Sequence, residues 1–188
     1  MADLATVADL NNFSQLALDP ADSSAAYLLK VASGMIRRYL EQDITAKAAD
    51  VEYADPVNGQ MVFLKQLPVT AVSLVETSTD DGVTWTTVLP ANYTVSKRLG
   101  VVAAKPWTGI DWGVDPESWR VTYDHGYATV PDELNGVCCS VASRFYATPV
   151  GIDMERTGQR QVKYSLESAG FTGAEAMVLA SFRNPRLA

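Results

Sequence analysis

Apolar residues near both ends of the chain recur at spacings of three and four, the period of an amphipathic helix. This spacing predicts four helices, over residues 6–16, 20–41, 131–147 and 172–184. The apolar stripe of the second helix has six members: Leu28, Ala32, Met35, Ile36, Tyr39 and Leu40. Gly34 interrupts that helix, and we expect so small a residue to let another helix approach closely.

Capping residues mark the starts of these helices. Thr6 with Asp9, and Thr172 with Glu175, have the spacing of a capping box, in which the two side chains bond each other's backbone N–H groups. Asp19-Pro20 predicts an N-cap followed by proline at the first helical position. Phe171, just before the last cap, predicts a hydrophobic staple.

Between about residues 50 and 125 the pattern changes to short runs of β-branched and aromatic residues, separated by turn residues. Residues 119–123 alternate apolar and polar, and Asp81-Gly82 is a hairpin signal. We expect five to seven short antiparallel strands here, followed by one extended run near residues 161–164. The predicted fold class is α+β, a helical core with an antiparallel β-rich insertion at about 50–125. The predicted domains are residues 1–150 and a C-terminal arm and helix at 151–188.

Composition places the chain among globular proteins, because 47% of its 188 residues are hydrophobic and 20% are charged. The formal net charge is −7, and the chain has no basic cluster. That balance argues against charge-driven binding to nucleic acid. No apolar run approaches the 18 residues or so of a membrane span, and the first residues do not have the pattern of a secretion signal. We expect synthesis in a reducing cytoplasm.

Few residues are available for catalysis. The chain has one histidine, His125, and two adjacent cysteines, Cys138 and Cys139, which excludes an ordinary zinc site and leaves one candidate for a catalytic base. We interpret His125 as a turn residue and the cysteines as buried thiols. Asp80 and Asp81 precede a glycine, so they indicate a turn rather than a paired-carboxylate site. We therefore expect no enzymatic activity, no cofactor and no metal.

Five short segments, taken in order, resemble the head–tail connector (adaptor) proteins of long-tailed bacteriophages. They are residues 39–41 (Y-L-E), 67–72 (L-P-V-T-A-V), 81–82 (D-G), 121–134 (V-T-Y-D-H-G-Y-A-T-V-P-D-E-L) and 145–146 (F-Y). Each segment is short, so their order and spacing carry the resemblance. It covers roughly residues 5–148, and the C-terminal arm and helix are its least diagnostic part.

The resemblance implies a structural protein of the virion neck. Proteins of this kind form a ring, typically of twelve copies, beneath the portal at the capsid vertex. They bind the portal on one side and a stopper or tail-completion protein on the other, and DNA passes through the lumen without specific binding. A ring subunit needs two lateral faces, so some apolar side chains should remain exposed in the single chain.

The C-terminal helix is the candidate for contact with the portal. Phe182, Arg183, Arg186 and Leu187 are residue types typical of interfaces, and adaptors resemble one another in gripping the portal with terminal segments. A helix of about three turns is too short to be stable alone in water. Whether its docking surface is the chain's own core or a neighbouring protein stays open in the sequence.

Three alternatives remain beside the adaptor. Another neck or tail component, a stopper or a tail terminator, would be mostly β-barrel and would lack the helical core. A small carboxylate-dependent hydrolase would have a concave pocket with two acids of raised pKa. A sugar- or peptide-binding module would expose Trp107, Trp112 and Trp119 in one plane, whereas we expect the loop tryptophans to pack onto the sheet.

Overall fold

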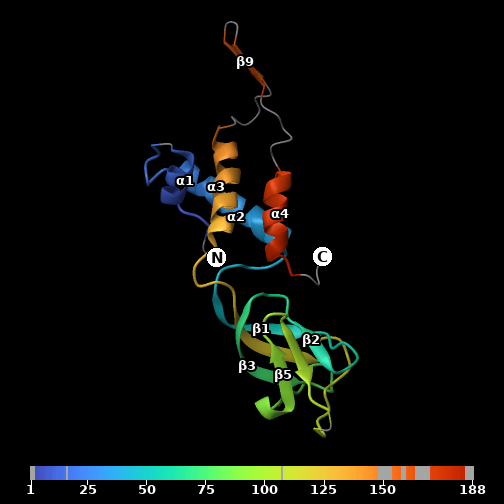
Figure 1. The fold of residues 1–188 in the computed structure, drawn as a ribbon. Helices are drawn as coiled ribbons and strands as arrows, with labels where there is room; N and C mark the ends of the chain where they lie inside the picture. The colour runs from blue at the N-terminus through green and yellow to red at the C-terminus, as the bar shows by residue number, and fades with distance from the viewer. Residues whose placement is uncertain are drawn as a thin grey trace. The chain divides into compact units, whose positions relative to one another are not determined.

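The computed structural model describes residues 3–15, 17–106, 108–147, 154–157, 160–163 and 170–184. The chain divides into two compact units. The helical unit is Met1–Glu41 with Val130–Ala188, and the β unit is Gln42–Thr129. Figure 1 shows the helices gathered in the first unit and strands β1 to β7 in the second.

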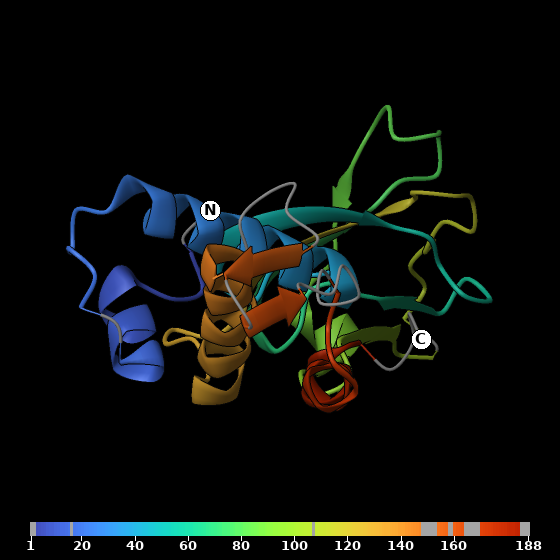
Figure 2. The same ribbon diagram turned by 90° about the horizontal axis from the view of Figure 1, so that it is seen from above.

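The helical unit contains the four expected helices: α1 (Val7–Ser14), α2 (Ser23–Leu40), α3 (Asp132–Ala147) and α4 (Gly173–Phe182). Helix α3 packs on α1 and α2, and α4 packs on α2 and α3. Figures 1 and 2 show α3 and α4 crossing α2 on the same side. The core between the helices is aliphatic and fully buried, with members such as Leu10, Leu29, Ile36, Leu134 and Leu179.

The starts of three helices test the predicted caps. Both capping boxes are present, Thr6 with Asp9 and Thr172 with Glu175. The expected cap of α2 is wrong by one turn, because Asp22 caps the helix and Oδ1 of Asp22 accepts the N–H groups of Ser24 and Ala25. Asp19 and Pro20 form the preceding turn, in which the N–H of Asp22 donates to the carbonyl of Asp19 at 2.9 Å.

Gly34 does not provide a close helix contact within the chain. It is exposed, and among the described residues no atom lies within 4 Å of the position that a Cβ would take. The expectation of a close approach at this glycine is therefore wrong for the helices of the helical unit.

The β unit is built from two antiparallel sheets. The four-stranded sheet has the order β1 (Lys47–Ala54), β7 (Trp119–His125), β3 (Val69–Thr77), β4 (Thr86–Thr87), and the three-stranded sheet has the order β2 (Met61–Phe63), β6 (Val101–Ala104), β5 (Tyr93–Ser96). A short 3₁₀ helix, Pro90–Asn92, precedes β5. The core is lined by Val62, Val75, Val102, Trp119 and Val121. The α+β prediction is confirmed.

A further pair of short strands, β8 (Met154–Thr157) and β9 (Arg160–Lys163), forms a hairpin where the sequence predicted one extended run. The domain boundary predicted near residue 150 falls at positions outside the described residues and stays a prediction. Across the described part of the chain, no helix is both long and apolar enough to cross a membrane.

Candidate interaction surfaces

Helix α4 is attached to the helical unit through one face. Leu179 on that face is fully buried, and Phe171, just before the cap, packs edge-on against Tyr39 of α2 with ring centroids 5.3 Å apart. The predicted staple residue thus contacts a neighbouring helix. In this structure, the surface that a short helix needs is supplied by α2 and α3.

A partly buried ion pair holds the first turn of α4. Glu175 Oε1 accepts hydrogen bonds from Arg144 Nη1 at 2.8 Å and Ser140 Oγ at 2.7 Å, and its Oε2 accepts from Arg144 Nη2 at 3.0 Å and the N–H of Thr172 at 2.8 Å. Burial alone would raise the pKa of Glu175, but these donors outweigh it and lower the pKa to about 2. The pair fixes α4 to α3 in one geometry.

The opposite face of α4 has no charged side chain. Glu175 is the one charged residue between Gly173 and Phe182, and it is buried. Met177 on the outer face is 78% exposed, and Ala174 and Ala180 are exposed too. Ser181 is the one other polar side chain of α4; it is exposed, and its hydroxyl donates to the carbonyl of Val178 at 2.7 Å. Since a helix with so few polar side chains is normally buried, the outer face has the character of a surface that an assembly covers.

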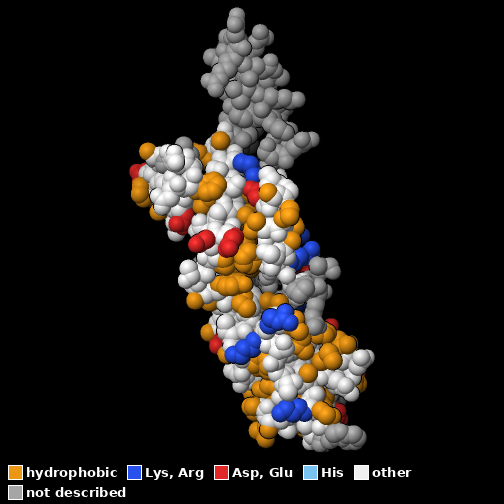
Figure 3. All heavy atoms as spheres, in the orientation of Figure 1, with side chains coloured by type: hydrophobic (Ala, Val, Ile, Leu, Met, Phe, Trp, Pro, Cys, Tyr) orange, Lys and Arg blue, Asp and Glu red, His pale blue; other side chains and the backbone are white. Residues whose placement is uncertain are grey.

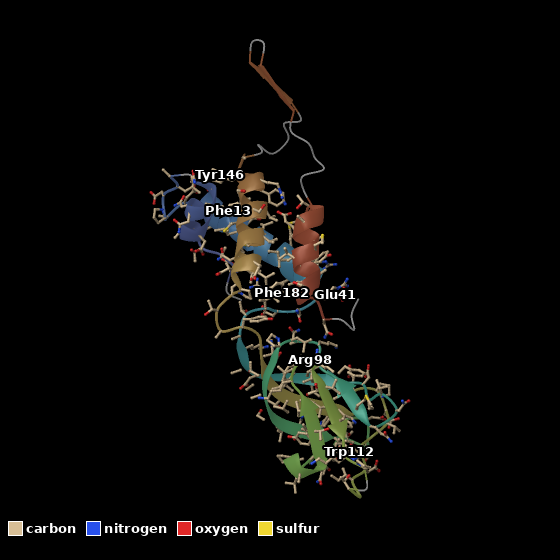
Figure 4. All side chains as sticks on the ribbon, viewed as in Figure 1. Phe13, Glu41, Arg98, Trp112, Tyr146 and Phe182 are labelled. Carbon is tan, nitrogen blue, oxygen red and sulfur yellow. The ribbon has the colours of Figure 1, made fainter. Side chains whose placement is uncertain are left out.

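Two of the four predicted portal-contact residues, Phe182 and Arg183, lie at the C-terminal end of α4. Phe182 is half-buried there, and Arg183 Nη2 donates to Glu41 Oε1 at 2.8 Å, at the C-terminal end of α2. Figure 4 shows Phe182 and Glu41 at the same end of the helices. Arg186 and Leu187 lie outside the described residues. The structure thus brings Arg183 to Glu41, and the contact of Phe182 and Arg183 with a portal stays a prediction.

Other apolar side chains at the surface of the helical unit were not singled out from the sequence. Phe13 of α1 is 52% exposed and Tyr27 of α2 is 66% exposed. Tyr146, at the end of α3, is partly exposed and donates to Asp22 Oδ2 at 3.1 Å. Orange side chains reach the surface in Figure 3 over both units. Tyr27 lies off the apolar stripe of its helix, and that displacement was the available signal. Phe13 lies three residues after the buried Leu10, so the spacing gave no signal of its exposure.

His125 is not the turn residue that the sequence suggested. It ends β7, is 2% exposed, and its Nε2 lies 3.1 Å from Asp50 Oδ2 on β1. Asp50 lies 75 positions earlier in the chain, so the pairing of β1 with β7 creates this contact. Both cysteines are buried and free, as expected, and burial raises the pKa of each thiol.

A second carboxylate, Glu52, lies two residues further along β1. It accepts from Tyr123 Oη at 2.5 Å and from the N–H of Lys65 at 3.1 Å. Burial raises the pKa of Glu52, and burial together with the Glu52 carboxylate raises the pKa of Tyr123. Burial would also raise the pKa of Asp50, but Lys47 and His125 lower it. The pKa of Asp50 is therefore lowered and that of Glu52 is raised, whereas the hydrolase alternative predicted two acids with raised pKa values.

The tryptophans do not form an exposed platform. Trp119 is fully buried, and Trp112 stacks on it with ring centroids 4.8 Å apart, as expected of a loop tryptophan that packs on the sheet. Trp107 lies outside the described residues. Asp80 accepts from Thr84 and Ser78 in a turn, which lowers the pKa of Asp80 to about 2 and confirms its turn role. The described residues contain no group of three or more His, Cys, Asp or Glu side chains that could hold a metal ion.

Comparison with known proteins identifies the family. A model of the head completion protein family matches residues 3–173, which is most of the chain. The chain belongs to the head completion protein family. The match spans α1, α2, the whole β unit and α3. No curated protein matches the sequence.

This head completion protein is similar in fold to chains from two solved particles. One is described as the neck of an empty gene transfer agent (GTA) particle computed with C6 symmetry, with a TM-score of 0.56 and 19% identity over 94% of this chain and 88% of that chain. The other is the virion of a native GTA particle, with a TM-score of 0.53 and 17% identity over the same shares of the two chains. The expected resemblance to head–tail connectors is confirmed. The family assignment gives the protein a structural role in head completion.

Proposed function

We propose that this head completion protein forms the adaptor ring beneath the portal, with α4 and the residues after it contacting the portal. The single observation that supports this assignment most strongly is the apolar outer face of α4, on a helix whose one charged residue is buried. The portal-contact residues are Phe182, Arg183, Arg186 and Leu187.

A ring of twelve copies accounts for two further observations. The neck of the GTA particle was computed with C6 symmetry, which rings of six and of twelve copies both obey. Exposed aromatic side chains on α1, α2 and α3 supply lateral faces for neighbouring copies. In such a ring the negative net charge keeps the lumen from binding DNA phosphates, so DNA passes without being held. The role requires no catalysis, cofactor or metal.

The helical core favours an adaptor over a stopper or a tail terminator. Helices α2 and α3 span Ser23–Leu40 and Asp132–Ala147, and a mostly β-barrel component would lack them. The adaptor therefore has the portal on one side and a stopper or tail-completion protein on the other.

Particles assembled without this chain provide the test. We expect filled heads to accumulate without tails, and addition of the purified protein to restore tailed particles, counted by electron microscopy. Heads that complete and join tails in its absence would contradict the proposal.

A further inference from the structure

The end of the β unit where β7 begins carries three loops. Strands β1 and β3 end at Ala54 and Thr77, both paired with Trp119 at the start of β7. The chain enters and leaves the unit at the other end, near His125, whose partners are Lys47 and Val69. We name residues 55–60, 78–84 and 108–118 the distal loops.

The distal loops expose aliphatic side chains. Val83 is 79% exposed, Val114 is 74% exposed, and Val57 is exposed as well. Loops normally present polar side chains to water, and isolated apolar residues there need no partner. Three such residues at one end of a unit, one of which lines a cleft, have the character of a binding surface.

A cleft of about 490 Å³ opens between residues 58–60 on one side and residues 104–106 and 108–114 on the other. Its apolar wall includes Ile110, Trp112 and Val114, and Trp112 is held by stacking on Trp119. Gly59 has a φ of 62°, and a Cβ there would lie 2.8 Å from Val114 Cγ1, so the two loops are packed closely. Figure 4 labels Trp112 in this part of the β unit. The cleft has the size to take one large side chain.

Charge on the distal loops as a set is one-sided, whereas the cleft itself is lined by one acid, Asp111, and one base, Lys105. The distal loops contain six acidic residues and no basic one: Asp55, Asp80, Asp81, Asp111, Asp115 and Glu117. Lys105 precedes the third loop and lines the cleft, and its Nζ donates to the carbonyl of Ala91 at 2.7 Å. Asp81, Asp115 and Glu117 are exposed. A partner that fits this surface carries positive charge beside an apolar anchor.

We infer that the distal loops bind a basic segment of the next neck or tail protein, with an apolar side chain of that segment in the cleft. The inference rests on the proposed function, because it gives the tail-facing partner a binding site. DNA is a poor occupant, since its phosphates meet six carboxylates. A second copy is also a poor fit, because each copy brings a net charge of −7.

The test replaces two acids that follow Val114 in the third distal loop, and it follows two joining steps separately. Tail-less filled heads are incubated with the full-length variant Asp115→Lys/Glu117→Lys, bound protein is measured, and tails are then added. We expect head binding like that of the wild type and at least a tenfold loss of tail joining. Glu133→Lys, an exposed acid at the start of α3, is the charge control and should join tails normally.

Val114→Ser provides a second variant that changes no charge. Because Val114 is 74% exposed, the fold should persist, checked by circular dichroism, while tail joining falls at least threefold. Normal tail joining by both variants would overturn the inference, as would an equal loss in Glu133→Lys. If both variants join tails normally but the particles eject DNA more slowly, the loops belong to the channel wall, and the inference is overturned. Failure of the wild-type protein itself to bind tail-less heads would overturn the proposed function.

Discussion

Glu175 is the residue on which the attachment of α4 depends most. Its pKa of about 2 lies below the ordinary value of 4.5, because the Arg144, Ser140 and Thr172 donors outweigh the effect of burial. A carboxyl group whose pKa is lowered by folding contributes stability above its unfolded pKa, and that contribution is lost as pH falls toward the folded value. The helical unit should therefore lose stability between about pH 4.5 and pH 2.

Glu175→Gln tests that dependence. We expect the variant to lose about 2–3 kcal/mol of unfolding free energy at pH 7, because the ionised partner of Arg144 is gone. Its stability should vary less than that of the wild type between pH 4.5 and pH 2. Urea unfolding followed by circular dichroism at several pH values measures both effects, and parallel pH curves for the two proteins would contradict this role of Glu175.

Glu52 should have the opposite pH dependence. Burial raises its pKa, so the fold favours the neutral carboxyl, and the stabilisation is complete below the ordinary pKa and declines as pH rises through the raised value. Glu52→Gln keeps an acceptor for Tyr123 Oη and should be at least as stable as the wild type at pH 8. Glu52→Ala leaves the Tyr123 hydroxyl without its carboxylate acceptor and should lower the free energy of unfolding by about 1–3 kcal/mol. Urea midpoints at pH 5 and pH 8 measure both variants, and a less stable Glu52→Gln at pH 8 would contradict the account.

At the scale of elements, helix α2 has one position, Gly34, where a substitution should increase the stability of the protein. Gly34 is exposed inside an 18-residue helix and has open space where a Cβ would lie. Gly34→Ala should raise the unfolding free energy by about 0.5–1 kcal/mol, through backbone entropy alone. A fall in the thermal midpoint would show that an alanine side chain does not fit at this position.

The outer face of α4 is tested by Met177→Glu. Because Met177 is 78% exposed, we expect a stability change within about 0.5 kcal/mol and a loss of portal binding of at least tenfold. Ala26→Glu, an exposed apolar-to-acidic change on α2, is the matched control. Pull-down of each variant with portal rings gives the binding, and equal binding by both variants would remove α4 from the portal contact.

The elements themselves were largely predictable, and the errors have one local cause and several long-range ones. Asp19 and Asp22 are both residues that often cap a helix, and the sequence favoured Asp19 because Pro20 follows it. In the structure, Asp22 is the cap, because the N–H groups of Ser24 and Ala25 donate to its carboxylate. The burial of His125 could not be predicted, because its partner Asp50 is brought beside it by strand pairing across 75 positions. The ion pair between Arg144 and Glu175, which attaches α4 to α3, also joins residues far apart in the sequence and could not be predicted from it.

At the scale of the whole molecule, the predicted order of helices, β insertion and helices is the order observed. The candidate portal site was predictable in part: Phe182 and Arg183 lie together at the end of α4, but the sequence did not show that Glu41 pairs with Arg183. The division into two units follows from the insertion, because residues 42–129 close their own core between two sheets. The surfaces that become buried in an assembly depend also on the other proteins of the particle, so they cannot be predicted from the sequence of this chain alone.

The most direct test of the central claim is the mass of the full-length protein in solution, alone and mixed with the portal protein of its particle, measured by light scattering. The account predicts that a portal ring gains the mass of twelve copies of this chain, and that Met177→Glu abolishes the gain while Ala26→Glu preserves it. A chain that stays unbound in the presence of portal rings, or that adds to them as one copy, would contradict the account.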